Sequence, residues 1–490
     1  MVLWTKPPTL EIFAGDPVEF EGPIIVPVQQ VEGKPSIPPV LEKLDKELSL
    51  GVRELVEAEK IKGKKGELLE IVRGKKIVVV VGLGESPDAE TVRRAYAKAS
   101  KKYVNTHESV LLVVTPLPED LRVEAYIGAA LGVYVLEEFK TEKKRKLAKL
   151  FVDSGLKGAE EAKAIVEGVY LARDLANAPP NHLYPERIAE IAQNLFPPLG
   201  VEVEVFDYER LLKEGFGGIV SVGKGSAKKP VLIVLKYRRG EGKPVALVGK
   251  TIVFDSGGIN LKPSHSVGTM KYDKAGGAAV LGALWTIAKA GLKANVYVLL
   301  PAAINAPGGE SYLPSDVIKM WDGTWLEIGN TDAEGRVVLS DAVAYAAKGL
   351  EADTIVTFAT LTGAIVLALG PLIAGVFTRD EDLLEKIKDA SKASGDKVWP
   401  MPMDEDYKPL LAKSAKTGDV NNIATRWGDP IYASFLLEKF SHGKRFAHID
   451  MAGPGFGAEG PVPAPDYWPK GSPGFGARLA YELVKRLVKG

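Results

Sequence analysis

Short apolar segments alternate with helix-like segments along the chain, and this alternation restricts the possible folds more than any other feature. The runs at 24–28, 76–82 and 109–116 are rich in Val, Ile and Leu and have the length of buried strands. Residues 89–102 and 120–131 have the periodicity of helices. Strands that alternate with helices pack as a sheet covered by helices. The sequence therefore predicts an α/β protein.

The length of 490 residues exceeds what one hydrophobic core usually holds. A charge-dense segment from Thr141 to Glu161 follows the first set of strands, and helical periodicity continues through Ala162–Leu175. Pro179-Pro180 ends this helical segment, and a second set of strands begins near Val201. We therefore expect two domains joined by a helix: a smaller N-terminal α/β domain over 1–150, a connecting helix over 151–170 and a larger C-terminal domain over 171–490.

Composition excludes several classes of protein. Lys+Arg and Asp+Glu number 63 each, so no global field favours nucleic acid or an anionic membrane as a partner. Cysteine is absent, which excludes disulfides, thiolate metal ligands and cysteine nucleophiles. Residues 354–378 carry no charge, but their threonines and glycines predict a buried strand, a short helix and a strand. The amino terminus lacks the pattern of a secretion signal, so we expect a cytoplasmic protein.

Motifs of several common enzyme classes are incomplete. Gly82-Leu83-Gly84 lacks the third glycine of the dinucleotide fingerprint, and Gly249-Lys250-Thr251 lacks the first glycine of a P-loop because Pro244 occupies that position. No two of the five histidines are four residues apart, so there is no zincin helix. Ser256 follows an aspartate and has no Gly-x-Ser-x-Gly context, which disfavours a serine hydrolase.

Acidic residues instead concentrate where strands and helices meet. Asp255 ends an apolar strand and precedes glycines that let the backbone approach a ligand. Asp273 immediately precedes a helix that is rich in small residues. We interpret the segment 330–336 as extended, in which case Asp332, Glu334 and Arg336 project from the same face.

Four carboxylates in one cleft would require cations. If Asp255, Asp273, Asp332 and Glu334 converge, they raise one another's pKa unless positive charge neutralises them. Two divalent ions balance four carboxylates, and bridging carboxylates hold such ions about 3.5–4 Å apart. Oxygen ligands suit Mn²⁺, Mg²⁺ or Zn²⁺. Each acid alone would be interpreted as a strand-end or helix-capping residue, but their combination predicts a dinuclear metal site.

Around Asp255 and Asp273, and in the segment 330–336, the sequence resembles the leucyl aminopeptidase family, the dinuclear metal cytosol aminopeptidases of the M17 type. Asn330-Thr331-Asp332-Ala333-Glu334-Gly335-Arg336 is the signature heptapeptide of that family without change. Segments 171–177, 360–364 and 448–453 also resemble family segments. The likeness covers the larger domain and, more faintly, the N-terminal one. It implies a catalytic domain over 171–490 with a central mixed β-sheet flanked by helices.

The resemblance also implies a role for individual residues. Lys250, Asp255, Asp273 and Glu334 would hold one metal, and Asp255, Asp332 and Glu334 the other. Lys262 would stabilise the oxyanion, and Arg336 would hold a bicarbonate that serves as general base. The residues implied to bind the substrate side chain are Met270, Asn330, Ala333, Thr360, Leu361, Gly363 and Ala452.

The implied activity is the release of N-terminal amino acids, Leu or other apolar residues, from peptide substrates by a water that two metal ions activate. The implied metals are Zn²⁺ or Mn²⁺, with Mg²⁺ or Co²⁺ as alternatives, and the implied assembly is a homohexamer. Two departures from the family pattern concern specificity. Lys274 stands where an apolar residue is usual, and Arg426–Pro430 replaces a region that is usually richer in Gly and Ala.

Two other functions remain open from the sequence. The first is a non-catalytic or moonlighting scaffold that binds nucleic acid, for which Lys143–Lys146 would be the basic patch. Net neutrality counts against it. The second is a glycosidase with a pair of carboxylates, which would need an acid and a nucleophile that are free of metal.

Overall fold

The computed structural model describes residues 5–457 and 462–488, and these form two compact units. One unit comprises the described residues up to 170 together with 464–469, and the other comprises the remaining described residues from 171 onward. Helix α5 (Ala159–Asn177) runs across the division. The expected boundaries at 150 and 170 stay a prediction about independently folding domains.

The smaller unit is built on a seven-stranded sheet. In sheet order its strands are β1 (Thr9–Ile12), β7 (Lys149–Val152), β6 (Ser109–Leu112), β2 (Pro23–Val31), β5 (Lys76–Gly82) and β4 (Leu68–Arg73), with β3 (Lys34–Ser36) paired to β2. All neighbours from β1 to β5 pair in parallel, whereas β3 and β4 pair antiparallel. Residues 23–28 are buried without interruption, as is typical of a central parallel strand.

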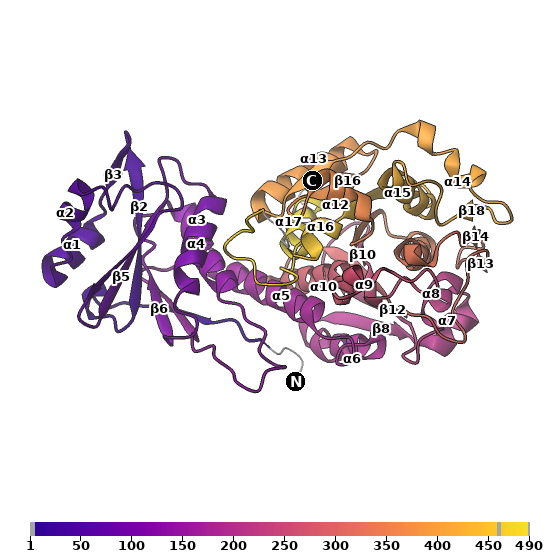
Figure 1. Ribbon diagram of the computed structural model, residues 1–490, viewed down its shortest axis with the longest axis horizontal. Helices are drawn as coiled ribbons and strands as arrows, with labels where there is room; N and C mark the ends of the chain where they lie inside the picture. Colours follow the sequence, from indigo (N-terminus) through magenta and orange to yellow (C-terminus); the bar gives the residue numbers. More distant parts are fainter. Residues whose placement is uncertain (1–4, 458–461, 489–490) are drawn as a thin grey trace. The chain divides into compact units, whose positions relative to one another are not determined.

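Helices lie on both faces of this sheet (Figure 1). They are α1 (Pro39–Leu48), α2 (Val52–Glu57), α3 (Ala89–Lys101) and α4 (Glu119–Gly132), and a 3₁₀ turn, η1, spans Pro17–Glu19. Leu41 and Leu44 of α1 share one core with Ile24, Val26 and Val28 of β2, which alternate along the strand and so point to one face. The expected α/β organisation of this region is confirmed.

The charge-dense segment differs from the expectation of one continuous helix. Residues 149–152 form the parallel strand β7 between β1 and β6, and helix begins only at Ala159. Leu150 and Val152 are buried in the sheet. Burial of these alternate side chains outweighs the helical charge pattern, because sheet pairing depends on tertiary context.

The larger unit is built on a nine-stranded mixed sheet. In sheet order its strands are β17 (Val398–Pro400), β16 (Ala374–Phe377), β19 (Arg445–Asp450), β15 (Thr354–Ala359), β10 (Val245–Gly249), β12 (Asn295–Asn305), β9 (Val231–Arg238) and β8 (Val201–Phe206), with β11 (Thr251–Asp255) paired to β12. The four central strands β19, β15, β10 and β12 are parallel, and β16 and β9 run antiparallel to them. The mixed central sheet is confirmed.

Helices and a small sheet surround these strands. The helices are α6 (Pro185–Leu195), α7 (Tyr208–Glu214), α8 (Gly217–Gly223), α9 (Ser264–Val267), α10 (Ala275–Lys289), α11 (Glu334–Ala344), α12 (Gly363–Leu369), α13 (Glu381–Ser394), α14 (Leu410–Lys413), α15 (Asp429–Phe440), α16 (Ala452–Gly455) and α17 (Ala477–Leu487). Shorter helical turns are η2 (Pro197–Leu199), η3 (Met270–Tyr272), η4 (Thr331–Ala333), η5 (Tyr345–Gly349) and η6 (Glu405–Tyr407). The small sheet has the order β13 (Val317–Lys319), β14 (Trp325–Glu327) and β18 (Val420–Asn421).

The two faces of the central sheet have different helices. Ala246 and Val248 of β10 share a core with α8, α11 and α15. Gly249 faces the other way, because a Cβ there would meet Gly277 and Val280 of α10. Helix α10 packs in turn on α17. The sheet is therefore enclosed between these two groups of helices.

The uncharged stretch 354–378 folds as strand β15, helix α12 and strand β16, as expected. Within the part of the chain that the structure describes, no helix combines the length and the apolar content needed to cross a membrane.

Candidate active site

The candidate site lies where several strands of the larger unit reach their carboxyl ends. Lys250 directly follows β10, Thr360 directly follows β15, and Asp255 is the last residue of β11. Because β10 and β15 pair in parallel, their carboxyl ends meet at one edge of the sheet, which is where ligands bind in α/β folds.

Three buried carboxylates meet at this edge. Asp255, Asp273 and Glu334 each contribute an oxygen, and these oxygens all lie within 4.8 Å of one another. None of the three residues is more than 3% exposed. They come from the end of β11, the residue after η3 and the first residue of α11. Segments far apart in sequence therefore build one acidic cluster.

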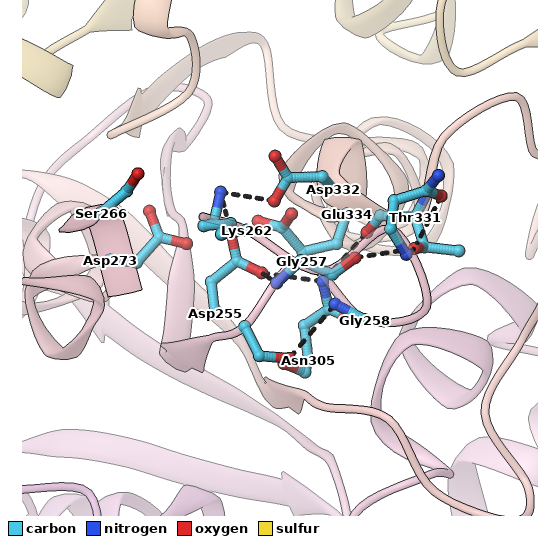
Figure 2. A network of polar contacts seen from close by, with 12 residues as sticks. Asp255, Gly257, Gly258, Lys262, Ser266, Asp273, Asn305, Thr331, Asp332 and Glu334 are labelled. Carbon is cyan, nitrogen blue, oxygen red and sulfur yellow. Dashed lines mark hydrogen bonds and ion pairs between the residues drawn. The ribbon is translucent and has the colours of Figure 1, made fainter. Parts of the chain in front are cut away.

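Two lysines compensate part of this negative charge. Lys250 Nζ lies 2.9 Å from Asp273 Oδ2 and 2.8 Å from Glu334 Oε1. Lys262 Nζ lies 2.9 Å from Asp255 Oδ2 and also contacts Asp332 Oδ1. Figure 2 shows Lys262 between these two carboxylates. Asp332 is thereby joined to the cluster, and all five residues expected to hold metal lie together.

Backbone and amide groups orient Asp255. Its Oδ1 accepts hydrogen bonds from Gly257 N at 2.9 Å and from Asn305 Nδ2 at 2.8 Å, which leaves Oδ2 for Lys262. Gly257 has a φ of +89°, and a Cβ there would lie 2.3 Å from the carbonyl oxygen of Asn260. The glycine that follows the strand is thus required for the turn that brings its N–H to the carboxylate.

Thr360 links two of the strand-end residues. Its hydroxyl donates to Asp273 Oδ1 at 2.7 Å, and its carbonyl oxygen accepts from Lys250 Nζ at 3.0 Å. Asp273 also lies two residues before α10, near the helix N-terminus, where the helix dipole favours a negative charge. These contacts position the Asp273 carboxylate next to Glu334.

Burial dominates the electrostatics of the carboxylates. It raises the pKa of Asp255 to about 6, with a further contribution from the Glu334 carboxylate. Burial also raises the pKa of Asp273 well above its ordinary range and raises that of Asp332. For Lys250 and Lys262 burial acts in the opposite direction, but the surrounding carboxylates outweigh it and raise the pKa of both lysines.

The residues of the cluster fit divalent cations. Four acids face two lysines, and Glu334 Oε2 is buried without a hydrogen-bond partner among the described residues. Hard oxygen donors of this kind bind Mg²⁺, Mn²⁺ or Zn²⁺. Lys250 would be a ligand only as a neutral amine, a form that a neighbouring cation favours.

A cavity of about 330 Å³ opens beside the cluster. Its wall includes Met270, Thr360, Leu361, Gly363 and Ala452, five of the residues expected to bind the substrate side chain. Sequence reasoning missed the other wall residues outside the cluster, which are Thr269, Thr362, Val366, Pro371, Gly453, Phe456 and Gly457. Thr362 and Gly453 lie inside the quoted segments 360–364 and 448–453, and Thr269 and Val366 lie one or two positions from quoted residues, so proximity to the motifs is the signal that could have found these four.

Asn330 and Ala333 do not line this cavity. The side chain of Asn330 accepts from the backbone N–H of Asp332 at 2.8 Å and so caps the turn η4. The carbonyl oxygens of Asn330 and Ala333 both accept from the Asn422 amide. Both residues thus shape the loop that carries Asp332, and their expected contact with substrate stays a prediction.

The segment 330–336 is not extended, and this expectation was wrong. Residues 331–333 form a 3₁₀ turn and α11 begins at Glu334. Residues two apart on a helix point about 200° apart, so Arg336 leaves the side of Glu334. Arg336 does not line the cavity, and its guanidinium instead contacts the Asn422 carbonyl oxygen at 2.9 Å and Asp429 Oδ2 at 2.6 Å.

Family models match both parts of the chain. The catalytic domain of the cytosol aminopeptidase family matches residues 170–481, and its N-terminal domain matches residues 25–143. The chain belongs to the cytosol aminopeptidase family. The resemblance inferred from the heptapeptide is therefore confirmed. The chain is a peptidase of the metallo-exopeptidase type and acts as an aminopeptidase on peptides.

Individual relatives match this chain over most of their own length. A probable cytosol aminopeptidase of Aeropyrum pernix is 49% identical over 493 residues, with 100% of both chains covered. Another, from Aquifex aeolicus, is 38% identical and covers 91% of this chain and 93% of its own. The bottromycin maturation enzyme BotP in complex with Mn superposes with a TM-score of 0.84 at 31% identity, covering 96% of this chain and 100% of that one. A mutant of tomato leucine aminopeptidase gives a TM-score of 0.85 at 26% identity, with 99% of both chains covered.

Proposed function

We propose that this aminopeptidase hydrolyses the first peptide bond of its substrates with two divalent cations, held by Lys250, Asp255, Asp273, Asp332 and Glu334. The observation that carries the proposal is the buried cluster of Asp255, Asp273 and Glu334 beside a cavity with apolar walls. Cations bound there would supply an acidified water and polarise the peptide carbonyl. A glycosidase would need carboxyl groups that are free of such charge, so this alternative fits poorly.

The residues of the chain orient the substrate. Lys262 lines the cavity and carries an ammonium group beside Asp255 and Asp332, so it can donate to the oxygen that gains charge when the carbonyl is attacked. A cation held by these residues would bind the free α-amino group of a peptide in its neutral amine form. This recognition requires a free N-terminus and thus favours exopeptidase action.

The cavity wall suits an apolar side chain. Met270, Leu361, Val366, Ala452 and Phe456 contribute carbon surface to it. Such surface favours Leu or another apolar residue at the N-terminus of the substrate, at about 25 cal/mol for each Å² removed from water. Lys274 does not line this cavity, so its departure from the family pattern leaves the apolar wall intact.

We further propose zinc or manganese as the metals, with magnesium or cobalt as alternatives. The Mn complex of the similar enzyme BotP supports manganese. The names of the relatives support a cytoplasmic location, and the family resemblance supports a homohexamer. The nucleic-acid-binding scaffold has no support of its own, because the chain belongs to a peptidase family and has no net charge.

Metal removal tests the central proposal. Protein that is stripped with a chelator should lose hydrolysis of leucine-p-nitroanilide, and addition of Mn²⁺ or Zn²⁺ should restore it. Metal analysis should find about two equivalents per chain. Glu334→Gln should bind less metal, whereas Glu310→Gln, an exposed glutamate outside the cluster, should behave as wild type. Full activity in metal-free protein would contradict the two-metal proposal.

A further inference from the structure

Arg336 is a buried cation with a single carboxylate partner among the described residues. It is 4% exposed, and its Nη2 lies 2.6 Å from Asp429 Oδ2. Its Nη1 donates to the carbonyl oxygen of Asn422 at 2.9 Å, and Nε has no hydrogen-bond partner in the described part of the chain. A buried guanidinium without a counter-charge is strongly unfavourable, so the Asp429 carboxylate is essential to this arrangement.

The backbone holds Asp429 in this place. Asp429 is the first residue of the twelve-residue helix α15, where the helix dipole favours a carboxylate. Gly428 before it has a φ of +64°, and a Cβ there would lie 2.4 Å from the Tyr407 ring. Pro430 after it restricts the first turn. These restraints fix the backbone at Asp429, from which its side chain reaches Arg336.

The ion pair is connected to the loop that carries the acidic cluster. Asn422, whose carbonyl oxygen accepts from Arg336, is fully buried. Its side-chain oxygen accepts from Gly329 N at 2.8 Å, and its amide donates to the carbonyl oxygen of Asn330 at 2.7 Å. Arg336 itself is only two residues after Glu334 on α11. Loss of the pair would therefore disturb the base of this loop.

The pair does not fit a separate anion on the same guanidinium. The family resemblance implies a bicarbonate at Arg336, but here a carboxylate of the chain already occupies Nη2. A second anion against this guanidinium would lie close to Asp429, whose side chain is only partly exposed, and like charges at short range in such a place repel. Bicarbonate and the Asp side chain both present oxygens of a planar carboxylate-type group, so they compete for the same donors.

We propose that Asp429 is a built-in substitute for a small carboxylate-type anion at Arg336. With Asp429 present the chain needs no bicarbonate, and with Asp429 removed Arg336 becomes a binding site for bicarbonate or formate. Asp429 is a positioning residue in this proposal, because it acts through Arg336 and the loop and no contact with substrate is assigned to it. The effect on activity rests on the proposed function, whereas the effect on anion binding does not.

Anion binding is the first test. Thermal unfolding of the full-length protein is measured in chloride and in bicarbonate at equal ionic strength. Asp429→Ala should gain a saturable rise of a few degrees in its Tm, because a ligand that binds only the native state stabilises it. Wild type should not respond. Asp380→Ala is the matched control, since Asp380 likewise stands at the start of a helix and pairs with an arginine, Arg445, outside the site.

Activity is the second test. In buffer freed of carbon dioxide, wild type should keep its kcat, whereas Asp429→Ala should lose about tenfold or more and recover with bicarbonate or formate. Asp429→Asn keeps the shape without the charge, and it should fold even if the alanine variant does not. Its amide still blocks the site, so it should lose activity without recovery.

Two results would overturn the proposal: a saturable rise in the Tm of wild type with bicarbonate, or no anion response in folded Asp429→Ala. If Asp429→Ala gains the Tm response but no preparation hydrolyses peptides, the anion site stands and the proposed function fails.

Discussion

Lys250 and Lys262 supply the positive charge of the acidic cluster from within the fold. Both are largely buried, and each contacts two carboxylates. They differ in surroundings, because the Lys250 side chain is 4% exposed and also donates to a backbone carbonyl, whereas that of Lys262 is 15% exposed. Lys262 is therefore the cation that a bound substrate can reach with the smaller rearrangement.

Replacement of Lys262 should separate binding from chemistry. Lys262→Ala should lower kcat on leucine-p-nitroanilide by about 10²–10³-fold, because it removes a donor to the developing oxyanion. KM should change much less, and Lys262→Arg should retain part of the rate. The measurement is steady-state kinetics together with metal content. Equal kcat in all three proteins would contradict the assigned role.

His448 should make stability depend on pH. Its ring is fully buried, its Nδ1 lies 2.8 Å from Thr357 Oγ1, and it stacks on Phe377. Burial, with a smaller effect of Arg336, lowers the pKa of His448 to about 3. In the unfolded state the pKa of histidine is about 6.5. Between about pH 3 and about pH 6.5 the unfolded state therefore binds a proton that the native state does not.

The free energy of unfolding should therefore fall as the pH decreases from about 6.5 toward 3, by at most about 1.4 kcal/mol per pH unit from this residue. His448→Phe should lose that part of the pH dependence and lose about 1 kcal/mol at neutral pH with the hydrogen bond to Thr357. Urea unfolding between pH 4 and 7 measures both. Parallel curves for wild type and variant would exclude His448 as the cause.

Helix α10 approaches the sheet closely because small residues line its buried side. A Cβ on Gly276 would lie 2.1 Å from the carbonyl oxygen of Phe358, and a Cβ on Gly277 would lie 2.1 Å from Thr251 Oγ1. Both contacts involve strands of the central sheet. Asp273 stands two residues before the helix, so the position of α10 also sets the position of this carboxylate.

A methyl group at this interface should therefore affect both stability and the site. Gly276→Ala should destabilise the protein by about 1–3 kcal/mol through overpacking and should weaken metal binding by moving Asp273. Gly309→Ala, where a Cβ meets no atom within 4 Å, should leave both unchanged. Denaturant unfolding measures the stability of the two variants and of wild type, and metal titration measures their metal affinity. Unchanged metal affinity in folded Gly276→Ala would contradict the coupling.

The compact units do not follow the order of the chain. Residues 464–469, near the C-terminal end, belong to the smaller unit. Tyr467 is 1% exposed, and its hydroxyl donates to Glu90 of α3 at about 3 Å, with distances of 3.0 and 3.1 Å to the two carboxylate oxygens. The core of the smaller unit is thus completed by a segment that follows more than three hundred residues later.

Removal of the Tyr467 side chain should destabilise the smaller unit. Tyr467→Ala should lower its free energy of unfolding by about 3–5 kcal/mol, as for other large buried aromatic residues. Trp427→Ala, which truncates a side chain that is 68% exposed, should change stability by less than about 0.5 kcal/mol. Hydrogen exchange of β2 and β5 locates the effect. Unchanged protection in Tyr467→Ala would show that the unit is stable without it.

Local patterns predicted most of the elements. Apolar runs at 24–28 and 76–82 became the central part of β2 and the whole of β5, and Pro179 follows the last residue of α5, Asn177, by two positions. These predictions succeeded because burial on both faces of a parallel strand needs an apolar run, which sequence shows directly. The prediction of a continuous helix before Ala159 was wrong, because the two buried residues of β7 gave too weak a local signal for a strand.

For the site, the sequence by itself determined the ligand types and the family, because carboxylates and lysines at strand ends and an unaltered heptapeptide are local facts. Only the tertiary structure decided which of them meet. It joined Asp255, Asp273 and Glu334 and turned Arg336 toward Asp429. The reason is that contact between residues far apart in sequence depends on strand order and on where a helix begins, and neither is written in any short segment of the chain.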